Sequence, residues 1–220
     1  MTKLARKPLE KRPLYREEIG NAIRNAIFAG ELQPGDRIVE TQWARDLGVS
    51  QSPVREAIRE LEMIGLVENI PYQGCFVRKV TKQDMKDNNR VRTYLEMLGI
   101  EDAVLGATKE QLQELSEIYD DMMAAAKKNA VTSYVKNNEL FHQRIIEISQ
   151  NKLLIRLWMQ CHVQDSTFFT TNFSGHSLEE LAVRHKAIYD AIESRDIDHA
   201  KEVIYRHFQE LNEELETDQE

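Results

Sequence analysis

Apolar residues recur three and four positions apart along most of the chain, which is the spacing of one buried helix face. Up to residue 80 this spacing alternates with short extended runs, whereas no strand-like alternation follows residue 81. We therefore predict a first domain over 1–80, in which 1–12 form a flexible arm, and a second domain over 81–220. The expected fold class is mainly α, with a winged helix-turn-helix domain followed by an all-helical bundle of six helices. The fourth helix of the bundle is expected to follow Asn151 and to run to about Phe169.

Residues 41–67, with the sequence TQWARDLGVSQSPVREAIRELEMIGLV, carry the clearest pattern of the first domain. They predict two helices joined by a tight turn at Gly48, because glycine tolerates the left-handed conformation that a sharp helix end needs. Extended runs over 66–70 and 75–80, separated by a Pro-Tyr-Gln-Gly turn, predict a hairpin, with a third short strand over 37–39. A hairpin after a helix-turn-helix makes the winged form of that motif.

The second helix of this motif separates apolar from polar residues. Its apolar face consists of Val54, Ala57, Ile58 and Leu61, and the residues off that face are Gln51, Ser52, Arg55 and Arg59. In a helix-turn-helix, residues at the start of the second helix enter the major groove of double-stranded DNA. The pattern therefore favours DNA binding, and the simpler alternative is a small helical hairpin whose arginines are solvated.

Charge is divided unevenly between the two predicted domains of this chain, whose net charge is −8. Residues 1–80 hold thirteen Lys or Arg and eleven Asp or Glu, a net charge of +2. Residues 81–220 hold sixteen and twenty-six, a net charge of −10. This division suits a DNA-reading head joined to a domain that stays off DNA. Because +2 is modest, we expect DNA affinity to require a homodimer.

Composition excludes several classes of protein. A hydrophobic content of 41% and a charged content of 30% are typical of a soluble globular protein. We find no apolar run as long as a membrane span and no secretory leader. Cys75 and Cys161 lie far apart, without metal-site spacing, which fits a reducing compartment. We therefore expect a cytoplasmic location and no membrane partner.

Four polar residues of the second domain fall among the apolar positions of their helices. Asn138 and His142 lie four residues apart on one helix, and His185 and His207 belong to the apolar series of two later helices. A buried polar group without a partner is costly, and several converging imidazoles are most simply satisfied by a metal ion. The alternative is that each histidine hydrogen-bonds its own neighbour.

Residues 14–80 resemble the DNA-binding domain of the GntR family of bacterial transcription regulators. The resemblance is carried by I-x3-I-x2-G-x-L-x-PG from Ile23 to Gly35, LGVSQSPVREAIREL from Leu47 to Leu61, and GLV from Gly65 to Val67. Gln51 stands where the family commonly has arginine. Glutamine can pair with adenine through two hydrogen bonds, so we expect a different operator sequence.

Residues 82–212 resemble the all-helical effector domain of the FadR subfamily, called FCD. The matched positions are Arg92, Glu96, Asn138, His142, Asn151, His185, Ala200 and His207. In metal-binding members, a carboxylate or amide and three histidines hold a divalent ion. The resemblance therefore implies Asn138, His142, His185 and His207 as ligands of zinc, nickel or manganese. Six helices rather than seven suggest the VanR-like branch.

The resemblance also implies a small-molecule effector, often a carboxylate, at positions that the ion leaves open. Arg92 fits the role of a clamp, because a guanidinium pairs with a carboxylate through two hydrogen bonds. The alternative is that Arg92 pairs with Glu96, four residues on, an interaction worth little at a surface.

Together these observations predict a dimeric regulator that is not an enzyme and that binds a palindromic operator with an affinity set by the effector. Arg55 and Arg59 are expected to contact phosphate or guanine, and Gln51 and Ser52 to contact base edges. Gln73-Gly74 of the wing would reach the minor groove or the backbone. One alternative is that the divalent ion itself is the signal. Another is a metal-dependent enzyme, although no inward Asp or Glu near the histidines is evident as a general base.

Overall fold

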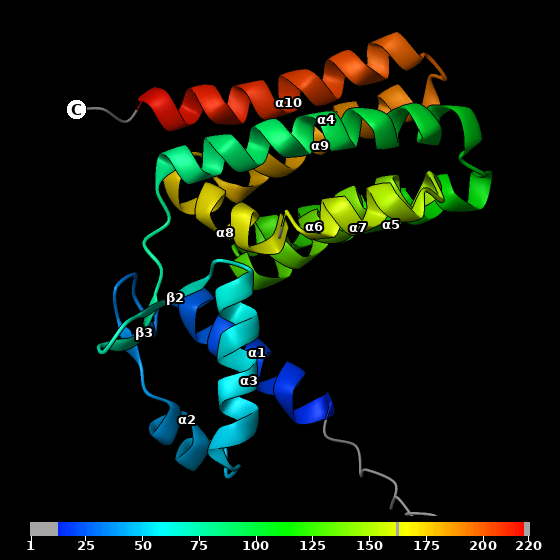
Figure 1. Cartoon of the computed structure of the whole chain (residues 1–220). Helices are drawn as coiled ribbons and strands as arrows, with labels where there is room; N and C mark the ends of the chain where they lie inside the picture. The colour runs from blue at the N-terminus through cyan, green and yellow to red at the C-terminus, as the bar shows by residue number, and fades with distance from the viewer. Residues whose placement is uncertain (1–12, 162, 218–220) are drawn as a thin grey trace, which may run out of the picture. The chain divides into compact units, whose positions relative to one another are not determined.

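The computed structural model of the protein describes residues 13–161 and 163–217. The chain divides into two compact units, with the boundary between Lys79 and Val80 (Figure 1). The flexible arm predicted over 1–12 lies outside the described residues. In the two described ranges, no helix combines the length and the apolar character needed to cross a membrane.

The N-terminal unit combines helices with one small antiparallel sheet. Its elements are α1 (Pro13–Phe28), β1 (Arg37–Ile38), α2 (Glu40–Asp46), α3 (Gln51–Met63), β2 (Val67–Ile70) and β3 (Gly74–Val77). The strand order is β1-β3-β2, with Ile38 opposite Cys75 and Ile70 opposite Gly74. The predicted winged helix-turn-helix is confirmed.

The core of this unit explains why these segments fold together. Ile23 of α1 and Val54 of α3 are fully buried, so the apolar faces of the two helices pack against each other. Gly48, between α2 and α3, has a φ of 66°, in the left-handed region that glycine adopts without steric cost. The polar side of α3 is thereby held away from the core.

The C-terminal unit is all-helical, as predicted, but its described residues form seven helices rather than six. They are α4 (Lys82–Gly106), α5 (Lys109–Lys127), α6 (Val131–Ile148), α7 (Lys152–Met159), α8 (Val163–Phe173), α9 (Leu178–Glu193) and α10 (Ile197–Thr217). The helix predicted over 151–169 is therefore wrong. The chain turns after α7, where the amides of Gln160 and Cys161 donate to carbonyls three residues earlier. The count of six was the ground for the VanR-like branch, so that assignment loses its support.

Helix α4 is the central element of this unit. It runs side by side with α10 and also packs against α6 and α7 (Figure 1). Gly99 allows a close approach to α6, since a β-carbon added there would lie 2.5 Å from Cδ1 of Ile146. At the start of α4, Thr81 and Asp84 form a reciprocal capping box. Close packing and the N-terminal cap therefore hold the backbone of α4 in place, and with it the positions of the side chains that point into the core.

Candidate functional site

The polar side of α3 is open to solvent. Gln51, Ser52, Arg55 and Arg59 are exposed, whereas Val54, Ala57, Ile58 and Leu61 are buried. Pro53 lies in the first turn of the helix, where the missing amide hydrogen has no helical partner to lose. A duplex can therefore reach all four predicted DNA-reading residues of this helix.

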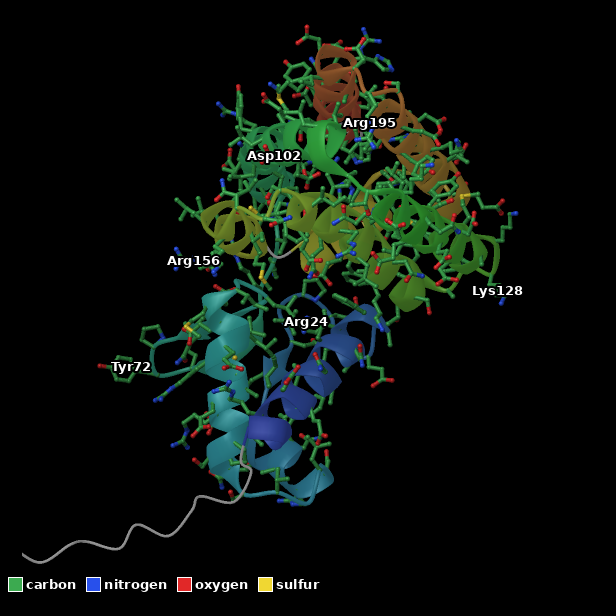
Figure 2. The ribbon with its side chains drawn as sticks, turned by 90° about the vertical axis from the view of Figure 1, so that its right-hand side faces the viewer. Arg24, Tyr72, Asp102, Lys128, Arg156 and Arg195 are labelled. Atoms are coloured by element: carbon green, nitrogen blue, oxygen red, sulfur yellow. The ribbon has the colours of Figure 1, made fainter. Side chains whose placement is uncertain are left out.

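The wing presents its turn beside α3. Figure 2 shows Tyr72 projecting from the tip of the β2–β3 hairpin, where it is fully exposed with a φ of 65°. Gln73 is exposed and Gly74 is half-buried under the guanidinium of Arg37. A groove of about 470 Å³ brings together residues of α3 and the hairpin. Its lining includes Arg55, Arg59 and Gly74 from the predicted site, together with Arg37, Glu40 and Asn69.

Three imidazoles lie together in the core of the C-terminal unit. His142 comes from α6, His185 from α9 and His207 from α10, and all three are buried. One ring nitrogen of each lies within 4.8 Å of the others. The Nε2 atoms of His142 and His185 are 3.2 Å apart. Asn138, four residues before His142 on α6, places its amide 2.8 Å from Nε2 of His185.

Hydrogen bonds fix which nitrogens of two of these rings face the cluster. Nδ1 of His142 donates to Oε2 of Glu96 at 2.6 Å, and Nδ1 of His185 lies 3.1 Å from the carbonyl oxygen of Leu181. A nitrogen that donates carries the proton of a neutral imidazole, so the opposite Nε2 carries a lone pair. When both rings are neutral with these tautomers, the two Nε2 lone pairs lie 3.2 Å apart and repel each other unless positive charge lies between them.

These residues fit a divalent ion. Nitrogens at the usual Zn–N distance around a tetrahedral ion are about 3.3–3.4 Å apart, close to the observed 3.2 Å. Nδ1 of His207 is buried and has no hydrogen-bond partner among the described residues. Burial lowers the pKa of His185 to about 3 and the pKa of His207 well below its usual value. Both rings are therefore neutral at pH 7, as a metal ligand must be.

Asn138 can join this ligand set through its side-chain oxygen. In the structure its amide nitrogen faces His185, while its oxygen accepts a hydrogen bond from the Thr167 hydroxyl at 2.8 Å. The two ends of an asparagine amide differ only by a flip. A flip would turn the oxygen toward the imidazoles, and the amide nitrogen could then donate to Thr167. All four predicted ligands are thus brought together by the fold.

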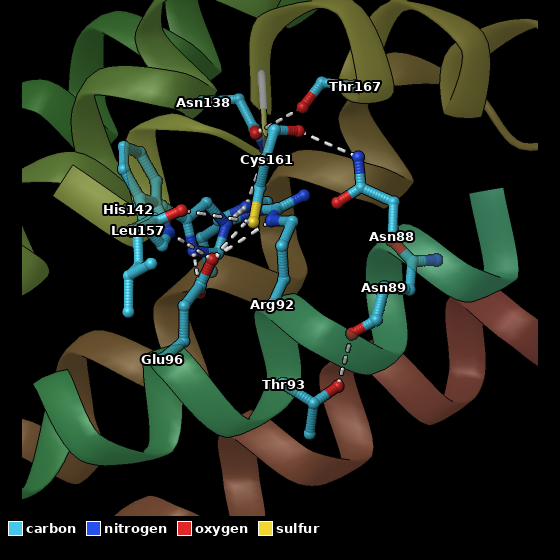
Figure 3. Close-up of polar contacts among 12 residues, drawn as sticks. Asn88, Asn89, Arg92, Thr93, Glu96, Asn138, His142, Leu157, Cys161 and Thr167 are labelled. Atoms are coloured by element: carbon cyan, nitrogen blue, oxygen red, sulfur yellow. Dashed lines mark hydrogen bonds and ion pairs between the residues drawn. The ribbon is translucent and has the colours of Figure 1, made fainter. Parts of the chain in front are cut away.

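A buried network on α4 supports this cluster (Figure 3). Arg92 is 3% exposed and pairs with Glu96, whose carboxylate also accepts from His142 and from the indole of Trp158 at 2.9 Å. Burial opposes ionisation of Glu96, but its contacts with His142, Arg92 and Trp158 outweigh that effect and lower the pKa of Glu96 to about 2. The Arg92–Glu96 pair considered for a surface therefore exists in the core, where it orients His142.

This network corrects one expectation. Glu96 is an inward carboxylate beside the histidines, although none was evident from the sequence. An arginine and a glutamate four positions apart on a helix have the spacing of a surface ion pair. No sequence signal distinguishes this pair from a surface pair, and only the structure shows that Glu96 is buried, together with Gly99 and Ile100 of the same helix.

A small cavity of about 20 Å³ adjoins the histidines, enough for an ion or one water molecule. Its walls include Arg92 from α4, three threonines of α8, and Arg184, which precedes His185 on α9. Arg184 pairs with Glu214, but its buried Nη1 has no hydrogen-bond partner in the described part of the chain. Two guanidiniums therefore line the cavity, of which the sequence pointed to Arg92 alone.

Comparison with known proteins agrees with this architecture. Residues 15–77 match the model of the bacterial regulatory proteins of the gntR family, and residues 89–210 match the FCD domain. The chain is 31% identical over 204 residues to the HTH-type transcriptional regulator YdhC of Bacillus subtilis (strain 168). That alignment covers 91% of this chain and 90% of YdhC.

Two solved structures share the fold. E. coli McbR/YncC superposes with a TM-score of 0.73 at 24% identity, covering 89% of this chain and 93% of that one. A GntR-type regulator from Rhodococcus sp. RHA1 gives a TM-score of 0.76 at 21% identity, covering 91% and 96%.

Proposed function

Because this chain belongs to the GntR family of bacterial regulatory proteins and carries an FCD domain, it is a transcription regulator, and we propose that a small carboxylate bound in its C-terminal unit controls how tightly its N-terminal unit binds DNA. The observation that carries the proposal is a cluster of three buried imidazoles on a cavity that two arginines also line. The chain is not an enzyme. Glu96, whose carboxylate lies beside the imidazoles, is already engaged by Arg92, His142 and Trp158.

The ligand set that we propose for the ion is Asn138, His142, His185 and His207. The neutral rings and the facing Nε2 atoms of His142 and His185 favour a divalent cation, for which zinc, nickel and manganese are the candidates. When bound, such an ion supplies positive charge and open coordination positions to an anion. Glu96 and the Leu181 carbonyl hold two of the rings in the tautomer that ligation needs.

Arg92 and Arg184 are the groups that we expect to bind the effector. Arg92 already shares its charge with Glu96 and lies 4.8 Å from the ring centroid of Phe208, which fixes its side chain. Arg184 offers an unused N–H inside the cavity. A guanidinium binds a carboxylate through charge-assisted hydrogen bonds. Because the cavity is small, a carboxylate of any size requires the surrounding helices to move apart.

The N-terminal unit supplies the DNA-binding part of this function. We propose that two copies of the chain bind a palindromic operator in the cytoplasm, each placing its α3 in the major groove. Gln51 and Ser52 would contact base edges, Arg55 and Arg59 guanine or phosphate, and Gln73-Gly74 the minor groove or backbone. The exposure of these side chains supports this role.

A second candidate function is that the ion itself is the signal. The size of the cavity, about 20 Å³, favours it, because an ion fits there without rearrangement. In that case chelation alone would change DNA affinity. A carboxylate would then have no further effect.

DNA affinity measured in four states of the full chain separates these functions. The protein would first select a duplex from a random library. This duplex would be titrated with chelator-treated protein and with protein loaded with zinc, nickel or manganese. Both titrations would be repeated in the presence of a panel of small carboxylates. We expect one carboxylate to change the Kd by about 5–150-fold in the metal-loaded state only. A change with metal alone would support the metal sensor.

Two variants of α10 make this experiment specific. His207→Ala should abolish both metal binding, measured by calorimetry, and the carboxylate effect. His199→Ala is the matched control, because His199 lies exposed on the same helix. Unchanged metal affinity in His207→Ala would contradict the proposed ligand set. No carboxylate effect in any metal state would contradict the proposed function.

A further inference from the structure

Arg55 does not extend freely from the recognition helix α3. Its guanidinium contacts the carboxylate of Glu40, the first residue of α2, with Nε 3.3 Å from Oε1 and 3.0 Å from Oε2, and Nη2 2.9 Å from Oε2. The side chains of Arg55 and Glu40 are 52% and 30% exposed. The pair therefore joins the two helices of the helix-turn-helix on the side that faces solvent.

This pairing changes what Arg55 can do for DNA binding. A side chain that anchors phosphates acts through its positive charge, and a nearby carboxylate cancels much of that charge. Arg59, one turn further along α3, is exposed and has no ion-pair partner within the described residues. The two arginines of α3 are therefore not equivalent, and Arg59 is the one suited to phosphate.

The geometry of the pair leaves the other edge of the Arg55 guanidinium available. Glu40 occupies the side edge, formed by Nε and Nη2. The end edge still presents one N–H from each of Nη1 and Nη2. Two parallel donors of this kind match O6 and N7 of guanine in the major groove. A long side chain that is already fixed also loses less conformational freedom when it binds.

We propose that Glu40 is a positioning residue that holds Arg55 for the recognition of a guanine, so that the pair confers sequence specificity and not general affinity for DNA. This rests on the proposed role of α3 in the major groove. Glu40 contributes in two ways. It orients the fork of Arg55, and its negative charge disfavours binding to the phosphates of unrelated DNA.

The test compares Glu40→Ala with Glu56→Ala in the full-length protein. Both variants remove one glutamate from the helix-turn-helix, Glu40 being partly exposed and Glu56 exposed, but of the two only Glu40 contacts Arg55. The Kd would be measured by fluorescence anisotropy for a duplex selected by the wild-type protein and for an unrelated duplex. Glu56→Ala should tighten binding to both duplexes alike. Glu40→Ala should lower the ratio of selected to unrelated affinity about ten-fold.

A second arm tests the guanine itself. Each guanine of the selected half-site would be replaced in turn by 7-deazaguanine, which keeps base pairing but lacks the N7 acceptor. One replacement should weaken the wild-type protein about ten-fold and have no effect on Arg55→Ala. Thermal unfolding would confirm that all variants are folded, as expected for side chains that are not buried in the core.

The outcomes are distinguishable. Equal affinity ratios for the Glu40→Ala and Glu56→Ala proteins would overturn the positioning role. The absence of any guanine whose replacement affects the wild type and not Arg55→Ala would overturn guanine recognition. If the wild-type protein enriches no duplex at all, the proposed DNA-binding function itself fails, and the failure is not specific to Glu40.

Discussion

Glu96 shows how one buried side chain organises the chemistry around it. Its carboxylate accepts hydrogen bonds from Arg92 on its own helix, from His142 on α6 and from Trp158 on α7. These partners keep the group ionised in the core. The carboxylate in turn decides which nitrogen of His142 faces the other imidazoles, so a residue outside the proposed ligand set orients one of the candidate ligands.

Replacing this carboxylate gives a prediction about stability. Glu96→Gln is expected to lower the free energy of unfolding by about 3–5 kcal/mol, because Arg92 would remain buried without its counter-charge. Urea denaturation of the metal-free protein measures the loss. Glu147→Gln is the control, since Glu147 pairs with Arg144 in a partly exposed position and should cost about 1 kcal/mol or less. Similar losses of unfolding free energy in the two variants would mean that the buried Arg92–Glu96 pair stabilises the protein no more than a partly exposed pair does.

Cys75 gives a prediction about pH. Burial is the largest of the effects that raise the pKa of its thiol, from 9.0 to about 11, because the thiolate is poorly solvated. Alkylation by iodoacetamide in a Cys161→Ser background should therefore reach half its maximal rate near pH 11 in the native protein, and near pH 9 in urea. Since the folded pKa is the higher one, this thiol contributes stability below pH 9 that is lost as the pH rises toward 11. A native midpoint near 9 would show that the thiol is solvated.

The candidate ligands were predictable because their positions depend on helical spacing alone. Asn138, His142, His185 and His207 each fall within an apolar series, so forming the helices already turns them inward. Glu96 was not predictable in this way. An Arg–Glu pair at this spacing looks the same on a surface and in a core, and only the packing of α4 against α6 and α7 decides between them.

At the scale of the elements, helix starts were easier to predict than one helix end. Thr81 with Asp84 and Ser177 with Glu180 are visible as capping boxes in the sequence, and the structure forms both. The end of α7 has no glycine or proline to mark it. The amide of Asn88 on α4 donates to the carbonyl of Cys161 at 2.8 Å, which satisfies an acceptor that the broken helix leaves free. A contact with α4 therefore stabilises the end of α7, which no glycine or proline marks in the local sequence.

The contact between α4 and α6 gives a prediction at this scale. Gly99→Ala should destabilise the protein by about 1–3 kcal/mol, because the new methyl group would overlap Cδ1 of Ile146. Adding Ile146→Val removes that atom and should recover part of the loss in a double-mutant cycle. Gly106→Ala is the control, as nothing lies within 4 Å of a β-carbon there. Additive effects of the two changes would contradict direct contact.

At the scale of the whole molecule, one face of α4 exposes apolar side chains to solvent, which is unfavourable unless another surface covers them. Val91, Tyr94, Leu98 and Leu105 are 55%, 68%, 56% and 68% exposed, and their spacing places them in one stripe along the helix. The homodimer that we propose would cover this stripe with the same stripe of a second copy. Arg90 and Glu101 flank it on one side toward opposite ends, but Glu101 already pairs with Lys201, so these charges do not fix how the two stripes would run.

Leu98→Glu therefore tests the homodimer. A charge at the centre of the stripe should convert a dimer to a monomer in sedimentation velocity and weaken operator binding at least ten-fold, because each copy would then bind one half-site alone. Leu153→Glu is the control, since Leu153 is 57% exposed on α7 and lies outside the stripe. A Leu98→Glu protein that sediments as the wild type does would place the interface elsewhere.

The position of Arg92 within α4 has one more consequence. Lys82, the first residue of this helix, follows the boundary between the units by two residues, and Arg92 lies ten residues further, about 15 Å along the axis. A hydrogen-bonded helix transmits rotation and translation along its length with little internal bending. An anion that bound the Arg92 guanidinium, as we propose, would therefore act on the helix whose first residue follows the boundary between the units. The proposed signal would then need no other helix of the C-terminal unit to carry it.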